Sequence, residues 1–474
     1  MDMNKRKFQE TFNSTEYNVD NEAKRITHQG SASLLTLPIE LVHVIFDKLD
    51  DFTIICSLCQ VCTRLNMILD AYPRYQTLTV GHINRRKISS TQVEELTDAL
   101  KTNTTITKCI VNGYYIGDYG AKLFADTLRN NKTLITLDLF RTTITCIGTE
   151  HLTLALLNNT TLTTLDLGHN GIHELGAHHL ASALRNNCTL TTLNLEHVEI
   201  GKLGIASLAD ALRKNTTLTA LDLGHNDIQN EGVQYLADAL RTNKALIKLN
   251  LTENSINDKG AQYLADALQN NQTLTTLNMN SNPIGDLGAQ HLSGALKNNM
   301  TITTLMLVEN AIGSLGAQYL SDALQNNTTL TTLDMTSNTI GDLGAQHLSG
   351  ALKNNTTLTK LNLRLNNIEH LGAQYLSDAL RNNNTLTKLN LVSTGIGNLG
   401  AKHLCDALRN NNTLTKLELA ANDIGNLGAQ HLAGALQNNT NLIELDLAYN
   451  EIRDEGAEHF VMALQENTVS AILF

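Results

Sequence analysis

The chain has 474 residues, a length that alone favours about three domains. Its formal net charge of -11 at pH 7 argues against general nucleic-acid binding, because that function needs a basic face. No run of 18 apolar residues occurs, so we expect no transmembrane helix.

Residues 1–33 are polar and of mixed charge, and we expect them to form a disordered tail. They lack the apolar stretch of a secretory signal peptide. The seven cysteines of the chain do not recur at a fixed spacing. Together these features predict a reducing, intracellular location, in the cytoplasm, the nucleus or both.

Residues 34–75 are more apolar and predict three short helices. Leu37, Leu41, Ile45 and Leu49 share one helical stripe, and Pro38 suits a first helical turn. A unit of about 40 residues rarely stabilises itself, and this one holds more apolar residues than a small core can hide. We therefore expect a docking module that completes its core on a partner.

Cys56, Cys59 and Cys62 lie three residues apart in this segment. A zinc site would need four ligands, and no fourth ligand is evident. The spacing also places the three side chains along a helix face, where free cysteine packs as a small apolar group. Core packing is the favoured interpretation, and we expect no metal and no cofactor.

The segment resembles an F-box, whose pattern is L-P-x-E-L, then I-F and L, then D-L, then V-C near the third helix. Leu65 stands where many members of that family have Trp, and a smaller anchor would contribute less to docking. The resemblance implies binding to a Skp-type adaptor and a cullin scaffold. The adaptor-binding residues that it implies are Leu37, Pro38, Leu41, Ile45, Phe46, Leu49, Val61, Cys62 and Leu65.

Residues 76–108 form a degenerate repeat of the kind that caps a solenoid. A first strand is predicted around Leu78 and Val80. A first helix is predicted from the spacing of Val93, Leu96, Ala99 and Leu100.

From residue 109 onward a 28-residue unit recurs in thirteen copies without insertion or deletion. The first leucine of an L-x-L pair falls at Leu137 and returns every 28 residues up to Leu445, and Cys109 holds the same place one period earlier. A fixed period in this range is typical of a solenoid. A partial last strand follows, in which Leu473 sits one period after Leu445.

Residues 161–187 show what one copy predicts. Leu162, Leu165 and Leu167 approach the period of two of a short strand, and the apolar spacing from Ala177 to Leu184 is that of one helix face. Asn186 and Asn187 follow and are expected to close the helix, since Asn tolerates the left-handed conformation. Stacking then buries the apolar face that a lone copy would expose.

The pattern L-x-x-L-x-L-x-x-N-x-I, followed by G-A-x-x-L-x-x-A-L, resembles leucine-rich repeats of the ribonuclease-inhibitor type. The expected fold class is α/β, a leucine-rich-repeat horseshoe solenoid behind a three-helix F-box. Parallel strands would line its inside and helices its outside, because helices are wider than strands.

Three rows recur in the copies. The isoleucine row from Ile116 to Ile452 predicts core. The glycine row from Gly120 to Gly456 predicts either close packing or a backbone angle that only glycine adopts. The asparagine row, which includes Asn170, predicts hydrogen bonds to the backbone of the turn. That row fails at Thr142, Val198 and Thr394, where we expect the turns to differ.

Nearly every copy also contains Asn-x-Thr, as at Asn159, Asn187, Asn215 and Asn327. In a secreted protein this triplet would accept glycosylation. Here it coincides with the helix-to-strand turn, and a structural origin is favoured.

The uniform period leaves no irregular feature to hold reacting groups, and the sequence shows no phosphate loop or nucleophile elbow. We therefore expect no enzyme activity. His169, His197 and His225 recur on the strand-to-helix turn, and repeat duplication on a solvated turn is favoured over a ligand site.

Residues that vary from copy to copy flank the inward leucines and suggest extended recognition on the concave face. Two patches are candidates for substrate binding. The residues of the first are Phe140 and Arg141; those of the second are Lys360, Lys388 and Lys416 on three adjacent strands, with Arg364 nearby.

The function that the resemblance implies is a substrate receptor of a Skp-cullin-F-box ubiquitin ligase, with an unknown protein as substrate and no binding to nucleic acid or membrane. The alternative is a free-standing inhibitor or sensor scaffold. A third hypothesis is a GTPase-activating protein, because Ran activators share this repeat type; Arg141 would then be its arginine finger.

Overall fold

The computed structural model describes residues 39–46, 76–79, 88–463 and 471–473. The chain forms two compact units, Met1–Val198 and Glu199–Phe474. No helix in the described ranges is long and apolar enough to span a membrane. The predicted tail (1–33) and most of the predicted three-helix module lie outside the described residues.

Among its described residues, the first unit has the helix α3 and then alternating strands and helices. Its elements are α3 (Ile39–Phe46), β1 (Thr77–Thr79), α6 (Ser90–Thr102), β2 (Lys108–Ile110), α7 (Gly117–Asn130), β3 (Thr136–Asp138), α8 (Cys146–Leu156), β4 (Thr164–Asp166), α9 (His173–Leu184) and β5 (Thr192–Asn194). The strands pair in parallel with their chain neighbours, and the register joins Leu137 to Leu165. Leu78 pairs with Cys109, so the first repeat is three residues longer than the period. The strand and helix predicted for residues 76–108 are confirmed as β1 and α6.

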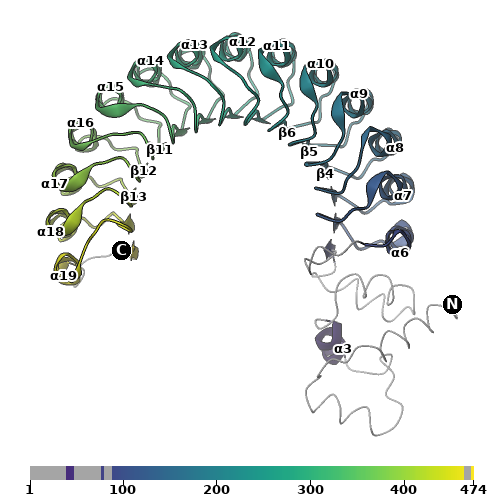
Figure 1. Cartoon of the computed structure of the whole chain (residues 1–474), viewed down its shortest axis with the longest axis horizontal. Helices are drawn as coiled ribbons and strands as arrows, with labels where there is room; N and C mark the ends of the chain where they lie inside the picture. Colours follow the sequence, from purple (N-terminus) through teal and green to yellow (C-terminus); the bar gives the residue numbers. More distant parts are fainter. Residues whose placement is uncertain (1–38, 47–75, 80–87, 464–470, 474) are drawn as a thin grey trace, which may run out of the picture. The chain divides into compact units, whose positions relative to one another are not determined.

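The second unit continues the same alternation. Its helices are α10 (Gly201–Leu212), α11 (Gln229–Leu240), α12 (Asp258–Leu268), α13 (Asp286–Leu296), α14 (Ser314–Leu324), α15 (Gly341–Leu352), α16 (His370–Leu380), α17 (Gly397–Leu408), α18 (Gly425–Leu436) and α19 (Asp454–Ala463). Its strands are β6 (Ala220–Asp222), β7 (Lys248–Asn250), β8 (Thr276–Asn278), β9 (Thr304–Met306), β10 (Thr332–Asp334), β11 (Lys360–Asn362), β12 (Lys388–Asn390), β13 (Lys416–Glu418), β14 (Glu444–Asp446) and β15 (Ala471–Leu473). Within this unit the strands line the inner side of a curve and the helices its outer side, as predicted (Figure 1).

The core of each copy lies between its strand and its helix. Leu165 of β4 and Leu167 just after this strand are buried, as are Ala177, Leu180 and Leu184 on the apolar face of α9. Cys109 holds the leucine place in β2, and burial raises the pKa of its thiol. The predicted periodic core is therefore confirmed.

The glycine row is required by close packing. A Cβ atom on Gly176 would lie 2.4 Å from Cγ2 of Ile172 in its own copy and 3.3 Å from Cα of Cys146 in the preceding copy. The φ of Gly176 is not positive. Of the two reasons predicted for the glycine row, the structure therefore supports close packing. The nearest atoms that a Cβ would meet at Gly176 belong to the isoleucine row.

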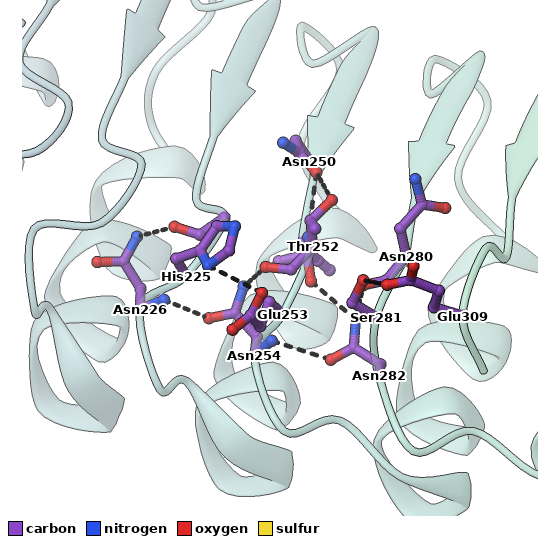
Figure 2. Close-up of polar contacts among 12 residues, drawn as sticks. His225, Asn226, Asn250, Thr252, Glu253, Asn254, Asn280, Ser281, Asn282 and Glu309 are labelled. Carbon is purple, nitrogen blue, oxygen red and sulfur yellow. Dashed lines mark hydrogen bonds and ion pairs between the residues drawn. The ribbon is translucent and has the colours of Figure 1, made fainter. Parts of the chain in front are cut away.

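The asparagine row links consecutive copies through buried side chains. Nδ2 of Asn254 donates to the carbonyl oxygens of Leu223 at 2.8 Å and Thr252 at 3.0 Å. Its Oδ1 accepts from the amides of Asn226 at 3.0 Å and Ile228 at 3.3 Å. One side chain thus joins its own turn to the turn of the copy before it (Figure 2). The predicted backbone hydrogen bonds are confirmed, and they extend across the repeat boundary.

Threonine replaces only part of this arrangement. Oγ1 of Thr394 donates to the carbonyl of Leu391 at 2.7 Å, which is the bond within its own turn. The backbone amide of Thr394 still donates to Oδ1 of Asn422, in the next copy, at 2.9 Å. The shorter side chain makes no bond to the preceding copy. The expected local difference at Thr394 is therefore confirmed, and Thr142 shows the same pattern with Leu139 and Asn170.

The expectation that Asn186 and Asn187 close their helix in the left-handed conformation was wrong, because neither has a positive φ. Nδ2 of Asn187 instead donates to the carbonyl of Leu156, in the preceding copy, at 2.8 Å. Its Oδ1 accepts from the amides of Thr189 and Leu190. The amide side chain satisfies these backbone groups, so no left-handed residue is needed. We call the buried hydrogen bonds of Asn187 and its equivalents the helix-end ladder. Those of Asn254 and its equivalents are the turn ladder.

The predicted register of the last strand was also wrong. Ile472, and not Leu473, lies opposite Leu445, one residue short of the period. Among the described residues β15 pairs with β14 alone, and one neighbour constrains register less than two. Because side chains alternate along a strand, this shift leaves Leu473 half exposed.

Asn254→Ala should destabilise the second unit by roughly 1–3 kcal/mol, because it leaves buried backbone groups of two copies without partners. Asn254→Thr should cost less, since threonine keeps the bond within the turn that Thr394 makes. Urea denaturation measures both losses. Asn270→Ala is the control, because Asn270 is exposed and should change stability by less than about 0.5 kcal/mol. Equal losses for Ala and Thr would contradict the assigned role.

Candidate interaction surfaces

Helix α3 carries three of the nine residues predicted to bind the adaptor, namely Leu41, Ile45 and Phe46. Leu41 is 38% exposed, whereas the next residue, Val42, is fully buried. An exposed leucine on a short apolar helix is what a docking surface needs, and the assignment stays a prediction. The other six predicted residues lie outside the described residues: Leu37, Pro38, Leu49, Val61, Cys62 and Leu65. Cys56 and Cys59 lie outside them as well.

The inner face of each copy is made by alternate residues of the strand and the turn after it. In β11 and the two residues after it, Leu361 and Leu363 are buried on the core side, so Lys360, Asn362 and Arg364 lie on the opposite face. The same alternation applies in the other strands. These positions therefore form the continuous surface that sequence analysis assigned to recognition.

A polar row that sequence analysis did not single out organises this face. Oδ1 of Asn250 accepts from the amide of Thr252 at 3.0 Å, and its Nδ2 donates to both carboxylate oxygens of Asp222 on the preceding strand, β6, at 2.9 and 3.0 Å. Figure 2 shows the bond between Asn250 and Thr252. The signal was present in the sequence, because Asp or Asn occupies this strand position in most copies.

The residue three places before the isoleucine of the isoleucine row adopts a left-handed backbone conformation in many copies. Examples are Arg141, His169, Glu253 and Leu365, with φ values of 56°, 54°, 52° and 56°. Among non-glycine residues, this conformation is comparatively favourable only for Asn, Asp and His. A leucine in it is therefore unusual. The backbone of the turn, and not the residue type, imposes the conformation.

Phe140 belongs to an aromatic cluster in the first unit. Its ring lies 4.7 Å from that of His169, and His169 stacks on His197 at 4.6 Å with an interplanar angle of 15°. The guanidinium of Arg141 lies 5.8 Å from the centre of the Phe140 ring. Gly168 makes room for this arrangement, since a Cβ atom there would lie 2.9 Å from Phe140. The predicted patch of Phe140 and Arg141 therefore extends along the histidine row.

In the second unit the same turn position lines an open hollow. Nδ1 of His225 lies 3.1 Å from a carboxylate oxygen of Glu253, and Oγ of Ser281 donates to Glu309 at 2.9 Å (Figure 2). Asn282, Pro283, Asn310 and Ala311 complete the lining. Both carboxylates already have partners. In the described part of the chain, no cluster of His, Cys, Asp and Glu has the arrangement of a metal site.

The structure divides the predicted lysine patch into two parts. Lys360, Lys388 and Lys416 face one another in register across β11, β12 and β13. Lys416 pairs with Glu444 at 2.7 Å and with Glu418 at 3.1 Å. The hydrogen bond to Glu444 is the main reason that the pKa of Lys416 is raised.

Lys360, Lys388 and Arg364 are exposed, and within the described residues no carboxylate pairs with them. The sequence pattern alone does not show which of the three lysines a carboxylate neutralises.

A second exposed row was missed by the sequence analysis, which followed the buried period. Near the start of six consecutive helices of the second unit, a leucine precedes the row glycine and is 45–62% exposed. These residues are Leu287, Leu315, Leu343, Leu371, Leu399 and Leu427. The repeated Leu-Gly-Ala was visible in the sequence, but its exposure depends on how the helix is turned toward its neighbours.

Two families match the chain. Residues 34–77 match the F-box domain, and eleven segments match the family described as Leucine Rich repeat. The repeat segments are 158–181, 186–209, 214–237, 242–265, 270–293, 298–321, 326–349, 354–377, 382–405, 410–433 and 438–461. The chain therefore belongs to the leucine-rich-repeat family. More particularly, it is an F-box protein with leucine-rich repeats, which confirms the resemblance drawn from the sequence. F-box domains bind Skp1-type adaptors.

Similar solved structures include the complex of Rad7 and Elc1 from yeast, at 18% identity over 78% of this chain and 86% of that chain, with a TM-score of 0.45. An internalin from Listeria monocytogenes is 20% identical over 92% of this chain and 94% of its own, with a TM-score of 0.42. The tropomodulin C-terminal domain of Caenorhabditis elegans is 19% identical over 32% of this chain and 92% of its own, with a TM-score of 0.28. A search of curated proteins gave no match.

Lys416→Met should cost about 1 kcal/mol more than Lys248→Met at pH 7, because exposed ion pairs contribute roughly 0.2–1 kcal/mol each and Lys416 makes two. Lys248 is the control, since it holds the same strand position in β7 and is exposed. The raised pKa of Lys416 means that this contribution is complete below its ordinary pKa of 10.5 and is lost as the pH rises through the higher pKa of the folded state.

Urea denaturation of the two variants at pH 7, and again above the pKa of Lys416 in the folded protein, measures both effects. Equal stability of the two variants at pH 7 would contradict the two ion pairs.

Proposed function

We propose that this protein is the substrate-recognition subunit of a Skp-cullin-F-box E3 ubiquitin ligase. The observation that carries the proposal is the order of two modules in one chain, an F-box domain at residues 34–77 followed by the repeat array. The first module would attach the protein to a Skp-type adaptor and its cullin. The second would hold the substrate.

The repeat surface suits this role because its framework and its exposed residues are separate. The leucine, isoleucine and asparagine rows are buried, whereas the inner-face positions change from copy to copy. A rigid surface with variable side chains can recognise an extended target. The protein would contribute proximity to the reaction and no catalytic group of its own. It would need no cofactor and would act in the cytoplasm, the nucleus or both.

Helix α3 supports the attachment step. Leu41 is exposed in it, together with Ile39, although both residues are large and apolar. Burying a large apolar side chain contributes roughly 1.5–3 kcal/mol, so these residues favour a partner surface. In the proposal they meet the adaptor with Leu37, Pro38 and the other residues implied by the F-box pattern.

The proposal predicts that the full chain carrying Leu37→Ala, Pro38→Ala and Leu41→Ala no longer captures a purified Skp1-type adaptor. Losing two large apolar contacts and the proline should weaken binding by at least about a hundredfold, given roughly 1.5–3 kcal/mol per buried side chain. Co-purification followed by calorimetry measures the loss.

Leu371→Ala is the matched control, because Leu371 is an exposed leucine on helix α16, in the repeat region. It should leave capture of the adaptor unchanged, and both variants should keep the thermal transition of the repeats. Wild-type capture by the triple variant would overturn the proposed function.

A further inference from the structure

The inner face of β11 and β12 concentrates positive charge that the fold does not neutralise. Lys360 and Lys388 occupy the same position on adjacent parallel strands, in register. Neighbouring strands lie about 4.8 Å apart, and like charges directly opposite one another are unfavourable. Both side chains are exposed, and no described carboxylate pairs with either. The arrangement therefore costs stability and contributes nothing evident to the fold.

Two further residues extend this surface. Arg364 follows Lys360 by four residues, lies on the same face of the chain and is exposed. Leu365 comes next, is 42% exposed and has a φ of 56°. The adjacent copies place Ser337 and Ser393 at this position. A leucine is thus presented to solvent, in an unfavourable backbone conformation, next to Arg364 in the chain.

Carboxylates limit the surface on both sides. The third residue of β11 and β12 is a neutral amide, Asn362 and Asn390, which keeps carboxylates out of these two strands. The same position holds Asp334 in β10 and Glu418 in β13. Lys416 forms ion pairs with Glu418 and Glu444, so it does not belong to this surface of unpaired cations. The positive region is therefore about two strands wide, or roughly 10 Å.

This narrow width decides which kind of anion fits. A nucleic acid or a lipid surface would meet the flanking carboxylates, because both present negative charge over a much larger area. A single extended peptide can place its carboxylates on two strands only. Lysine and arginine both form strong charge-assisted hydrogen bonds with carboxylates, and Leu365 would contact an apolar side chain.

From this geometry we infer that the surface of Lys360, Arg364, Leu365 and Lys388 binds an extended acidic segment of a partner protein that carries an apolar residue among its carboxylates. The inference rests on the proposed function, since it names the chemistry by which the repeat surface recognises a substrate. It also excludes Lys416 from the set that the sequence pattern had grouped together.

The test is fluorescence anisotropy with the full chain. The probe is a labelled peptide of about ten residues, rich in Asp and Glu with a central Leu, which spans the surface at about 3.3 Å per residue. Paired Lys360→Glu and Lys388→Glu changes should weaken binding by at least about tenfold, and Arg364→Glu should act in the same direction. Leu365→Ser, which installs the residue of the adjacent copies, should weaken binding without altering its dependence on salt.

Lys248→Glu is the matched control, because Lys248 is an exposed lysine at the same strand position in β7. It should leave peptide affinity unchanged. A peptide with Gln and Asn in place of Glu and Asp should not bind. Absence of saturable binding, equal weakening by Lys248→Glu, or binding of anionic vesicles or an oligonucleotide in place of the peptide would each overturn the inference.

Capture of the adaptor is measured on the same preparations, and it separates this inference from the proposed function. If the parent chain captures the adaptor but does not bind the peptide, the inference fails and the proposed function stands. If the chain binds the peptide but cannot capture the adaptor, the proposed function fails and the acidic-segment site stands.

Discussion

Two ladders of buried asparagine side chains set the geometry of the repeats. In the turn ladder Asn254 bonds the backbone of its own copy and of the copy before it. In the helix-end ladder Asn271 does the same for the other end of the copy, donating to the carbonyl of Leu240 at 2.8 Å. Apolar contacts tolerate small shifts, whereas a buried amide with several partners does not. The ladders therefore explain why the spacing stays at 28 residues while the exposed residues vary.

Because buried residues fix the spacing of the copies, the exposed residues of the inner face can differ from strand to strand. The aromatic cluster around Phe140, the hollow between Glu253 and Glu309 and the cations of β11 and β12 all lie at inner-face or turn positions, in different copies. Each surface is small, and each has its own charge. A protein built in this way distinguishes partners by which copies they contact, since the framework beneath every copy is the same.

The sequence was sufficient to predict the alternation of strand and helix, the buried rows and the hydrogen bonds of the turn asparagines, because all three repeat with one period. It was not sufficient at places where partners come from outside the copy. The use of Asn187 depends on a carbonyl of the preceding helix, and the register of Ile472 depends on a single neighbouring strand. The separation of Lys416 from Lys360 and Lys388 likewise depends on two glutamates, Glu418 on its own strand and Glu444 on the neighbouring strand β14.

The helix-end ladder has a consequence for the Asn-x-Thr triplets. The nitrogen to which a glycan would be attached is the same Nδ2 atom that donates to the preceding helix, as in Asn159, Asn187 and Asn327. These side chains are buried, so an oligosaccharyl transferase could reach them only on the unfolded chain, and a sugar added there would prevent the copies from stacking. The copies therefore stack only if these asparagine side chains stay unmodified.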